Sequence, residues 1–445
     1  MNNWEYILFL AAQALSELGD HLWSIGLRNY FFENSPWTPA AGLAIVFVLQ
    51  AIPVFAFGPW LTSRINGRWR RVALFSDIFR LLATLVFAIY VSSKNLSEND
   101  VGVLFVLLAV QLALEAGSLI FQNCRNCLVP SLYPHKNRIE QAHLWANVAS
   151  LSAAGVVPLL FFIALPSGGK VSLDWLVSAA IVDAVSFGLS AASLFTLKYS
   201  KRVKAIEQSS QQQSVDHENG KLSSWVAVYK RYPAAARILL YSFFYNLVLM
   251  GPFEIGHVTF LRSDLQLPPS VLAVNLLLFL LGIFAGTFAA NRSWKNGSSN
   301  HFQRFANAIV WDGLTFLPIC IFSLLKDQIP RPLFLSGISI LFLFHYAMVP
   351  FVRVSRLAGI QATTNQKDWN AILSLHAVAV EGAGALSVIA VALLWHDVSG
   401  VSLLAAGGIA ATVTGLLGTV GVWNKKNEQV PLCTGNDARN DSQFH

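Results

Sequence analysis

Apolar segments of about 20 residues recur along the chain and alternate with short polar connections, and a helix of that length crosses the hydrocarbon core of a bilayer. Proline and glycine near residues 166–169 and 328–332 mark turns between such segments. The predicted spans are 5–32, 40–62, 72–92, 101–122, 141–165, 173–197, 236–261, 269–291, 306–325, 332–352, 370–396 and 399–423. The pattern therefore predicts an all-α membrane protein with twelve transmembrane helices.

The chain divides into two halves around a polar middle segment. Residues 198–235 contain a Ser/Gln run, which is typical of a flexible linker. We expect one six-helix bundle at 1–197, a second at 236–423, and a tail at 424–445. Segments on either side of the linker resemble each other loosely, so the two bundles are predicted to be pseudo-symmetric, with a site near the membrane midplane between them.

Composition and charge agree with a membrane setting. The chain is 54% hydrophobic and 12% charged, whereas a soluble protein carries about 25% charged residues. Most of its Lys and Arg residues fall on the side that holds both termini and the linker, including 64–71, 125–138 and 353–367, which we assign to loops. The positive-inside rule therefore predicts cytoplasmic termini in an inner (plasma) membrane. The net charge of +7 is explained by anionic headgroups, and we expect no nucleic-acid partner.

Charged side chains interrupt the first apolar segment. At helical pitch they fall within about 100° of one another, on one face. They are Glu17, Asp20, His21 and Arg28. Charged groups at membrane depth cost roughly 2.5–3.5 kcal/mol each and face a bundle interior or an aqueous pathway. We therefore predict that this helix lines a transport route; a structural cluster that joins two helices is the alternative.

Further ionisable residues lie inside the other predicted spans: Asp77, Arg80, Glu115, Asp183, Glu254, His257, Asp312, His345, His376 and Glu381. Four of these, Glu115, Asp183, His345 and Glu381, lie near mid-span, where a central cavity would be deepest. A buried carboxylic acid that loads and releases protons would couple transport to a proton gradient. Glu17 or Asp20 is the first candidate for that role, and Glu115 or Glu254 the second.

Several of these residues also fit structural roles. Asp77 and Arg80, spaced i, i+3, are expected to form a structural ion pair. Arg28 lies close to one end of its span, where a long side chain reaches the interface by snorkelling. Asp312 lies near the predicted cytoplasmic end and is expected to be hydrated. His345 and His376 are each also consistent with a hydrogen-bonded core histidine.

No motif in the sequence indicates an enzyme. Cys124 and Cys127 form a CxxC pair without a second ligand pair, so we expect no zinc site. No nucleophile motif or cofactor loop is present, and we expect no cofactor. The predicted partners are a small-molecule substrate, protons and the lipid bilayer, and we expect a monomer.

Two segments resemble motifs of the major facilitator superfamily. Residues 58–64, followed by 68–72, resemble the family's signature loop between its second and third helices, although Thr62 and Ser63 stand where an acidic residue is usual. Gly155-Val-Val-Pro158 is similar to part of the antiporter motif of exporters. The resemblance covers nearly the whole chain and implies transport by alternating access.

Within the superfamily, three short segments resemble the small-molecule effluxers that include the enterobactin exporter: residues 18–20, residues 70–72 with Asp77, and residues 142–144. This resemblance implies proton-coupled export of a small polar or anionic organic molecule, such as a siderophore or a drug. An anionic substrate would suit the cationic candidates, which are His21, Arg28, His257, His345 and His376.

A weaker resemblance points to ferroportin. Ser16, Gly19-Asp20 and Trp23 are similar to the first helix of that family, in which an aspartate binds metal. The alternative function is therefore export of a divalent metal ion, with Asp20, Glu254 and His376 as the ligands that the resemblance implies.

Overall fold

The computed structural model describes residues 4–34, 39–64, 68–94, 101–133, 141–150, 153, 171–197, 225–267, 270–295, 301–365, 368–395 and 398–420. All regular structure in these ranges is helical, and they contain no strand. The antiporter-like residues 155–158, most of the predicted linker and the predicted tail lie outside them.

The first half contains α1 (Trp4–Asn34), α2 (Pro39–Arg64), α3 (Trp69–Lys94), α4 (Val101–Leu132) and α6 (Leu173–Thr196), and residues 141–150 are also helical. Ser172 caps α6, because its hydroxyl accepts a hydrogen bond from the Trp175 backbone N–H at 3.3 Å.

The second half begins with a short helix, α8 (Trp225–Arg231), inside the predicted linker. It continues with α9 (Pro233–Thr259), the π-helical turn η2 (Phe260–Asp264), α10 (Ser270–Lys295), α11 (His301–Leu314), α12 (Phe316–Ser323) and α13 (Arg331–Ala362). The last span is α14 (Trp369–Ala377), the π-helical turn η4 (Val378–Gly382) and α15 (Ala383–Leu394), followed by α16 (Gly400–Val420). π-helical turns inside α-helices often mark functional sites.

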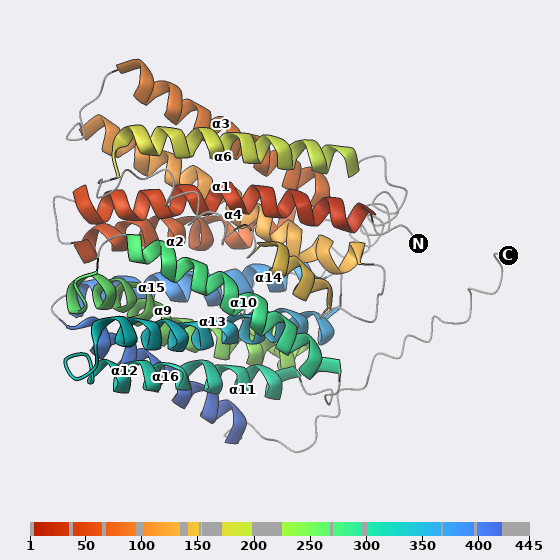
Figure 1. The fold of residues 1–445 in the computed structure, drawn as a ribbon. Coiled ribbons are helices and arrows are strands. Elements are labelled where there is room, and N and C mark those ends of the chain that lie inside the picture. The colour runs from red at the N-terminus through yellow and green to blue at the C-terminus, as the bar shows by residue number, and fades with distance from the viewer. Residues whose placement is uncertain are drawn as a thin grey trace.

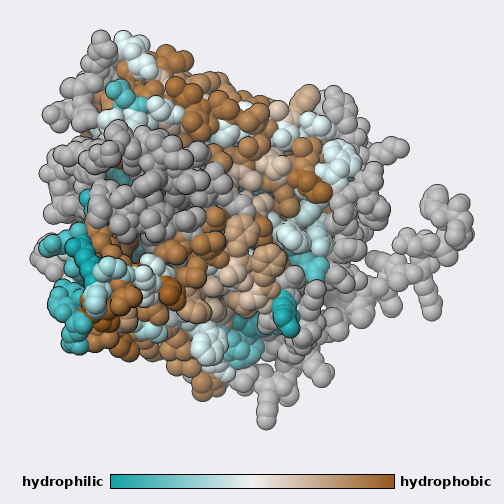
Figure 2. All heavy atoms as spheres, in the orientation of Figure 1, coloured by the Kyte–Doolittle hydropathy of each residue, from teal (hydrophilic) through white to brown (hydrophobic). Residues whose placement is uncertain are grey.

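The helices form an apolar layer. Eight segments within the described residues are long and apolar enough to cross a membrane, and two shorter apolar helices cover 44–56 and 278–290. Figure 2 shows hydrophobic residues across the middle of the visible face and hydrophilic ones gathered toward its two ends. The described part of the chain is therefore all-helical, and the chain is a multi-pass membrane protein; the number of twelve spans remains a prediction.

Helices of each half pack mainly with one another. α1 and α3 both pack on α6, whereas α9 packs on α15 and α16, and α10 packs on α13. Figure 1 shows α1, α3 and α6 lying together, and α9, α11, α13 and α16 forming a second group. The halves meet where α2 contacts α14, η4 and α15, and where α4 contacts α14. This arrangement accords with two bundles, whose six-plus-six composition remains a prediction.

Two predicted spans are shorter than the helices that form. α4 continues to Leu132 and α13 continues to Ala362, about ten residues beyond the predicted ends at 122 and 352. The assignment of Arg125, Arg353 and Arg356 to loops is therefore wrong. Polar residues made these segments look like connections, but α4 has no glycine or proline between residue 122 and Pro130, and α13 tolerates an interior proline at Pro350.

Candidate functional site

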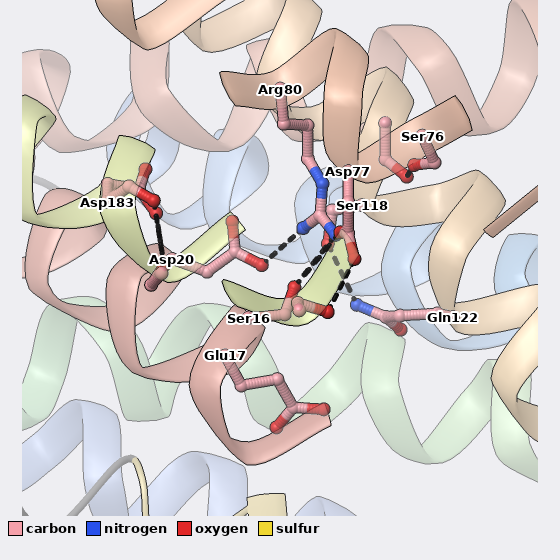
Figure 3. Close-up of polar contacts among 12 residues, drawn as sticks. Ser16, Glu17, Asp20, Ser76, Asp77, Arg80, Ser118, Gln122 and Asp183 are labelled. Atoms are coloured by element: carbon pink, nitrogen blue, oxygen red, sulfur yellow. Dashed lines mark hydrogen bonds and ion pairs between the residues drawn. The ribbon is translucent and has the colours of Figure 1, made fainter. Parts of the chain in front are cut away.

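Arg80 forms the centre of a buried cluster between α1, α3 and α6, which we call the acidic cluster (Figure 3). Its guanidinium donates to Asp20 Oδ2 at 2.7 Å and to Ser16 Oγ at 2.9 Å, and it also pairs with Asp77 Oδ1. Asp77 accepts a further hydrogen bond from Ser190 at 2.5 Å. The predicted Asp77–Arg80 ion pair is present, and it extends to the first helix.

A third carboxylate, Asp183 on α6, completes the acidic cluster (Figure 3). Its side chain is fully buried and faces α1 at Gly19, where an added Cβ would lie 2.1 Å from Asp183 Oδ1. Glycine at this position therefore lets α1 approach α6 closely. Asp183 Oδ2 has no hydrogen-bond partner among the described residues.

Glu17 belongs to a different region, at the border of the first half, where it acts electrostatically on Arg353 of the second half. It pairs with Arg125 of α4, and it accepts hydrogen bonds from the Ser150 hydroxyl and, at 3.3 Å, from the Gln13 amide. Arg125 also lines a small cavity of about 10 Å³, which is room for about one water molecule.

We call this cavity and the charged residues around it the cationic cavity. Its walls come from α1, α4, residues 141–150 and α13, and are lined by Gln13, Arg125, Asn126, Val129, His143, Ala146, Asn147, Arg353, Val354 and Leu357. Asn147 is 5% exposed, and both polar atoms of its amide are unpartnered within the described part of the chain. Unsatisfied buried amides are costly, so this side chain is available to a ligand.

Positive charge exceeds negative charge around the cavity. Arg353 and Arg356 come from α13, and neither has a carboxylate within ion-pair distance among the described residues. Glu381, in the π-helical turn η4, interacts electrostatically with both arginines and with Arg125. His376 is buried nearby, and its Nε2 lacks a partner within the described residues. His21, on α1, interacts with Glu17 and Arg353.

Hydrogen bonds join the halves close to this cavity. Gln361 on α13 donates to the Asn126 carbonyl at 2.8 Å and also bonds His143 Nε2. Further along the interface, Arg28 on α1 donates to Glu254 Oε2 on α9 at 2.9 Å, and its guanidinium lies 4.7 Å from the centroid of Phe47. Arg28 therefore joins two halves, in addition to lying near a span end as expected.

Glu115 lies in a polar chain inside the first half. The Trp23 indole donates to Gln111 at 2.7 Å, and Gln111 donates to Glu115 at 2.6 Å. Glu115 interacts electrostatically with Glu381 and Asp20, so it stands between the two charged regions.

The second half holds its own buried acid. Asp312 is fully buried and accepts from the Tyr245 hydroxyl at 2.6 Å, so the expectation that it is hydrated is wrong. α11 turns Asp312 toward α9 and α13, which removes it from water. His345 lies 3.3 Å from Asp312 and 3.1 Å from Thr315, in agreement with a hydrogen-bonded core histidine. His257 stacks on Phe253, with ring centroids 5.3 Å apart.

The metal-ligand set implied by ferroportin is not assembled here. Asp20 pairs with Arg80, Glu254 pairs with Arg28, and His376 lies among arginines. No group of three His, Cys, Asp or Glu residues that could hold a metal occurs among the described residues. The CxxC cysteines are buried in α4 as free thiols.

Sequence reasoning missed four cavity residues: Arg125, Asn147, Arg353 and Arg356. The arginines were attributed to topology, and a single asparagine in an apolar segment carries little signal. The absence of a helix breaker between residues 122 and 130 was the available clue to Arg125.

No protein-family model and no curated protein matches the sequence. Solved structures match over nearly the whole chain. The E. coli proton:xylose symporter XylE, of the major facilitator superfamily, aligns with a TM-score of 0.68 at 10% identity, over 93% of this chain and 94% of XylE. The chain has the major facilitator fold. A bacterial homologue of the iron transporter ferroportin aligns with a TM-score of 0.67 at 14% identity, covering 93% and 97% of the two chains.

The human organic anion transporter MFSD10 aligns with a TM-score of 0.65 at 13% identity, over 94% of this chain and 99% of that one. These proteins carry different cargoes on one architecture, so the shared fold leaves the cargo to be argued from the site. The Gly58–Arg64 part of the loop motif has side chains outside the described residues.

Proposed function

We propose that the chain is a secondary active transporter that works by alternating access and exports a small anionic organic molecule in exchange for protons. The fold supports a transporter, because the solved structures that it matches are transporters of the major facilitator type. The cargo class and the coupling come from the charged residues of this chain.

The observation that carries the proposal is the cationic cavity at the interface of the halves. Arg125 comes from the first half and Arg353 from the second, so an anion between them contacts both halves. Arginine forks bind carboxylates and phosphates in bidentate geometry. The Asn147 amide adds a buried donor and acceptor that no described residue satisfies. A carboxylate-bearing molecule of siderophore or drug type meets these requirements.

Glu17 supplies a link to protons. In this structure the Glu17 carboxylate forms an ion pair with Arg125, at the position that a substrate anion would take. Protonation of Glu17 weakens that pair and releases Arg125 for an anion, whereas loss of the proton restores it. This linkage makes anion binding depend on pH, since a ligand shifts an equilibrium by its differential affinity for the two states. Because it favours the proton and the anion together, the exchange itself needs a second acid, which gives up its proton as the halves move.

The opposite end of the interface supports alternating access. Arg28 and Glu254 bridge the halves there, while Gln361, Asn126 and His143 bridge them near the cavity. With contacts on both sides, the cavity holds about one water, so cargo must enter by separation of the halves at one end. The predicted orientation places the cavity toward the cytoplasm.

Uptake into inside-out proteoliposomes tests the proposal. Radiolabelled citrate, salicylate and neutral xylose serve as probes, with and without an interior-acid pH gradient. We expect a gradient-dependent accumulation of an anionic probe that a protonophore abolishes, and none of xylose. If the protonophore leaves accumulation unchanged, proton coupling is ruled out. If only xylose is transported, an anionic cargo is ruled out.

Divalent metal export is the second candidate, and the fold shared with the bacterial ferroportin homologue is its support. Titration of the purified protein with Co²⁺ separates the two candidates. The Arg80–Asp20 pair predicts no saturable binding, whereas binding that Asp20→Ala abolishes would favour the metal.

A further inference from the structure

The acidic cluster has more negative than positive groups. It combines three carboxylates, Asp20, Asp77 and Asp183, with one guanidinium, Arg80. These are the charged groups that face Asp183 from α1 and α3, the helices packed on α6. If all four were ionised, the cluster would carry a net charge of −2 inside the membrane.

The surroundings offer no compensation for that charge. Arg80, Asp77 and Asp183 have no exposed side-chain surface. The Arg80 guanidinium is sandwiched between aromatic rings, at 4.3 Å from the centroid of Phe187 and 4.9 Å from that of Phe121. An isolated ionised carboxylate in such a medium is so costly that it takes up a proton instead.

Hydrogen bonding distinguishes among the three acids. Asp77 accepts hydrogen bonds from Arg80, Ser16 and Ser190. Asp20 accepts one from Arg80 at 2.7 Å, so these bonds stabilise both groups as carboxylates. The Asp183 carboxyl group accepts only one long hydrogen bond, from the Ser186 hydroxyl at 3.5 Å, and its Oδ2 has no partner among the described residues. It is the acid with least support for a negative charge.

We propose that Asp183 holds a proton in this state and that Asp20 is the group through which the proton enters and leaves. Asp20 is the one member of the three with surface in contact with the exterior, since its side chain is 23% exposed. The ion pair with Arg80 keeps Asp20 ionised while Asp183 is neutral. When Arg80 shifts away, the ionised Asp20 accepts the proton of Asp183 across the α1–α6 contact at Gly19 and releases it at its exposed side; the reverse steps return a proton to Asp183.

The resting proton on Asp183 follows from charge and burial alone, whereas its use in coupling rests on the proposed function. The cluster lies inside the first half, apart from the cationic cavity. Proton storage is thereby assigned to the acidic cluster inside the first half, and anion binding to the cationic cavity at the border of that half.

Infrared spectroscopy of the purified full-length protein in lipid nanodiscs tests the proposal. A protonated carboxyl group gives a C=O stretching band that ionised carboxylates lack. We expect the band at neutral pH, its shift on labelling with isotopic aspartate, and its loss in Asp183→Asn. Asp77→Asn is the matched control and should keep it. In Asp20→Asn the band should persist, with hydrogen–deuterium exchange slowed at least about tenfold.

A band that does not shift with labelled aspartate, or that survives Asp183→Asn unchanged, overturns the proposal. So does stabilisation of the wild type by Na⁺ that Asp183→Asn removes, because a cation would then replace the proton. If Asp183→Asn fails to fold, the labelled wild-type band decides alone, and its absence contradicts a neutral aspartate. Gradient-driven transport in Asp183→Asn at the wild-type rate, with the band lost, would remove the coupling role while leaving the proton in place.

Discussion

The acidic cluster and the cationic cavity are both buried in this membrane protein, but the cluster has an excess of negative charge and the cavity an excess of positive charge. The cluster lies within one half, holds three carboxylates around Arg80, and is packed by aromatic rings. The cavity lies between halves, holds arginines from both, and contains an amide with unpartnered atoms.

The contrast shows how the surroundings of a charge at membrane depth indicate its role. A surplus of negative charge in a largely buried cluster is balanced most simply by a proton, which needs no space. A surplus of positive charge beside a cavity with free hydrogen-bonding groups suits an anion that comes and goes. Sequence patterns place charges in a span, but the partners of each charge decide between these outcomes.

Removal of Arg80 gives the largest expected effect. Arg80→Met leaves buried carboxylates without their cation, and breaking a buried pair costs about 3–5 kcal/mol. We expect a large fall in the thermal unfolding midpoint of the detergent-solubilised protein. Arg80→Lys keeps the charge but lacks the fork that reaches both Asp20 and Asp77, so its loss should be smaller. Equal stability of Arg80→Met and wild type would contradict the cluster.

Removal of Arg353 tests the cavity rather than the cluster. A hydrogen bond to a charged group contributes about 1.5–3 kcal/mol, so Arg353→Ala should weaken binding of a transported anionic probe roughly ten- to hundredfold. Unfolding should change little, because Arg353 has no ion pair among the described residues. Arg71→Ala, at an exposed position on α3, is the control and should bind normally. Equal losses in both variants would point to a general effect of charge.

Glu17→Gln removes the carboxylate that occupies Arg125. We expect anion binding to tighten several-fold, up to about the tenfold that 1.4 kcal/mol represents. Binding to the wild type should strengthen as pH falls, since protonated Glu17 releases Arg125, and this dependence should flatten in Glu17→Gln. Isothermal titration across a pH series measures both. An unchanged pH profile would show that Glu17 does not control access of the anion to Arg125.

The smallest effect on stability is expected at the opposite end of the interface. Arg28 and Glu254 have side chains 30% and 21% exposed, and such partly exposed pairs contribute about 0–1 kcal/mol. Glu254→Gln should leave the unfolding midpoint nearly unchanged but increase labelling of a cysteine placed at that end. The exchange Arg28→Glu with Glu254→Arg should restore wild-type labelling. Failure of the exchange to restore it would argue against a gating contact.

The sequence predicted the helical membrane architecture because apolar length is a local signal. It also predicted the Asp77–Arg80 pair, since i, i+3 spacing fixes proximity on a helix. It did not predict that Asp20 joins that pair, or that Asp312 is buried, because both depend on which helices pack together. Arg125 and Arg353 were not predicted as site residues for another reason. Basic residues at a membrane boundary usually only set the orientation of the protein, and the roles of these two become visible because their helices continue past the predicted ends.

The most direct test of the cationic cavity measures its charge and access together. Asn147→Cys, in a chain whose native cysteines are replaced by serine, is labelled in inside-out vesicles with thiol reagents that carry a sulfonate or a quaternary ammonium group. A cavity lined by Arg125 and Arg353 predicts that the sulfonate reagent reacts faster, by about tenfold or more, and that Arg353→Ala reduces this preference. Faster reaction with the ammonium reagent, or no reaction with either, would contradict the account.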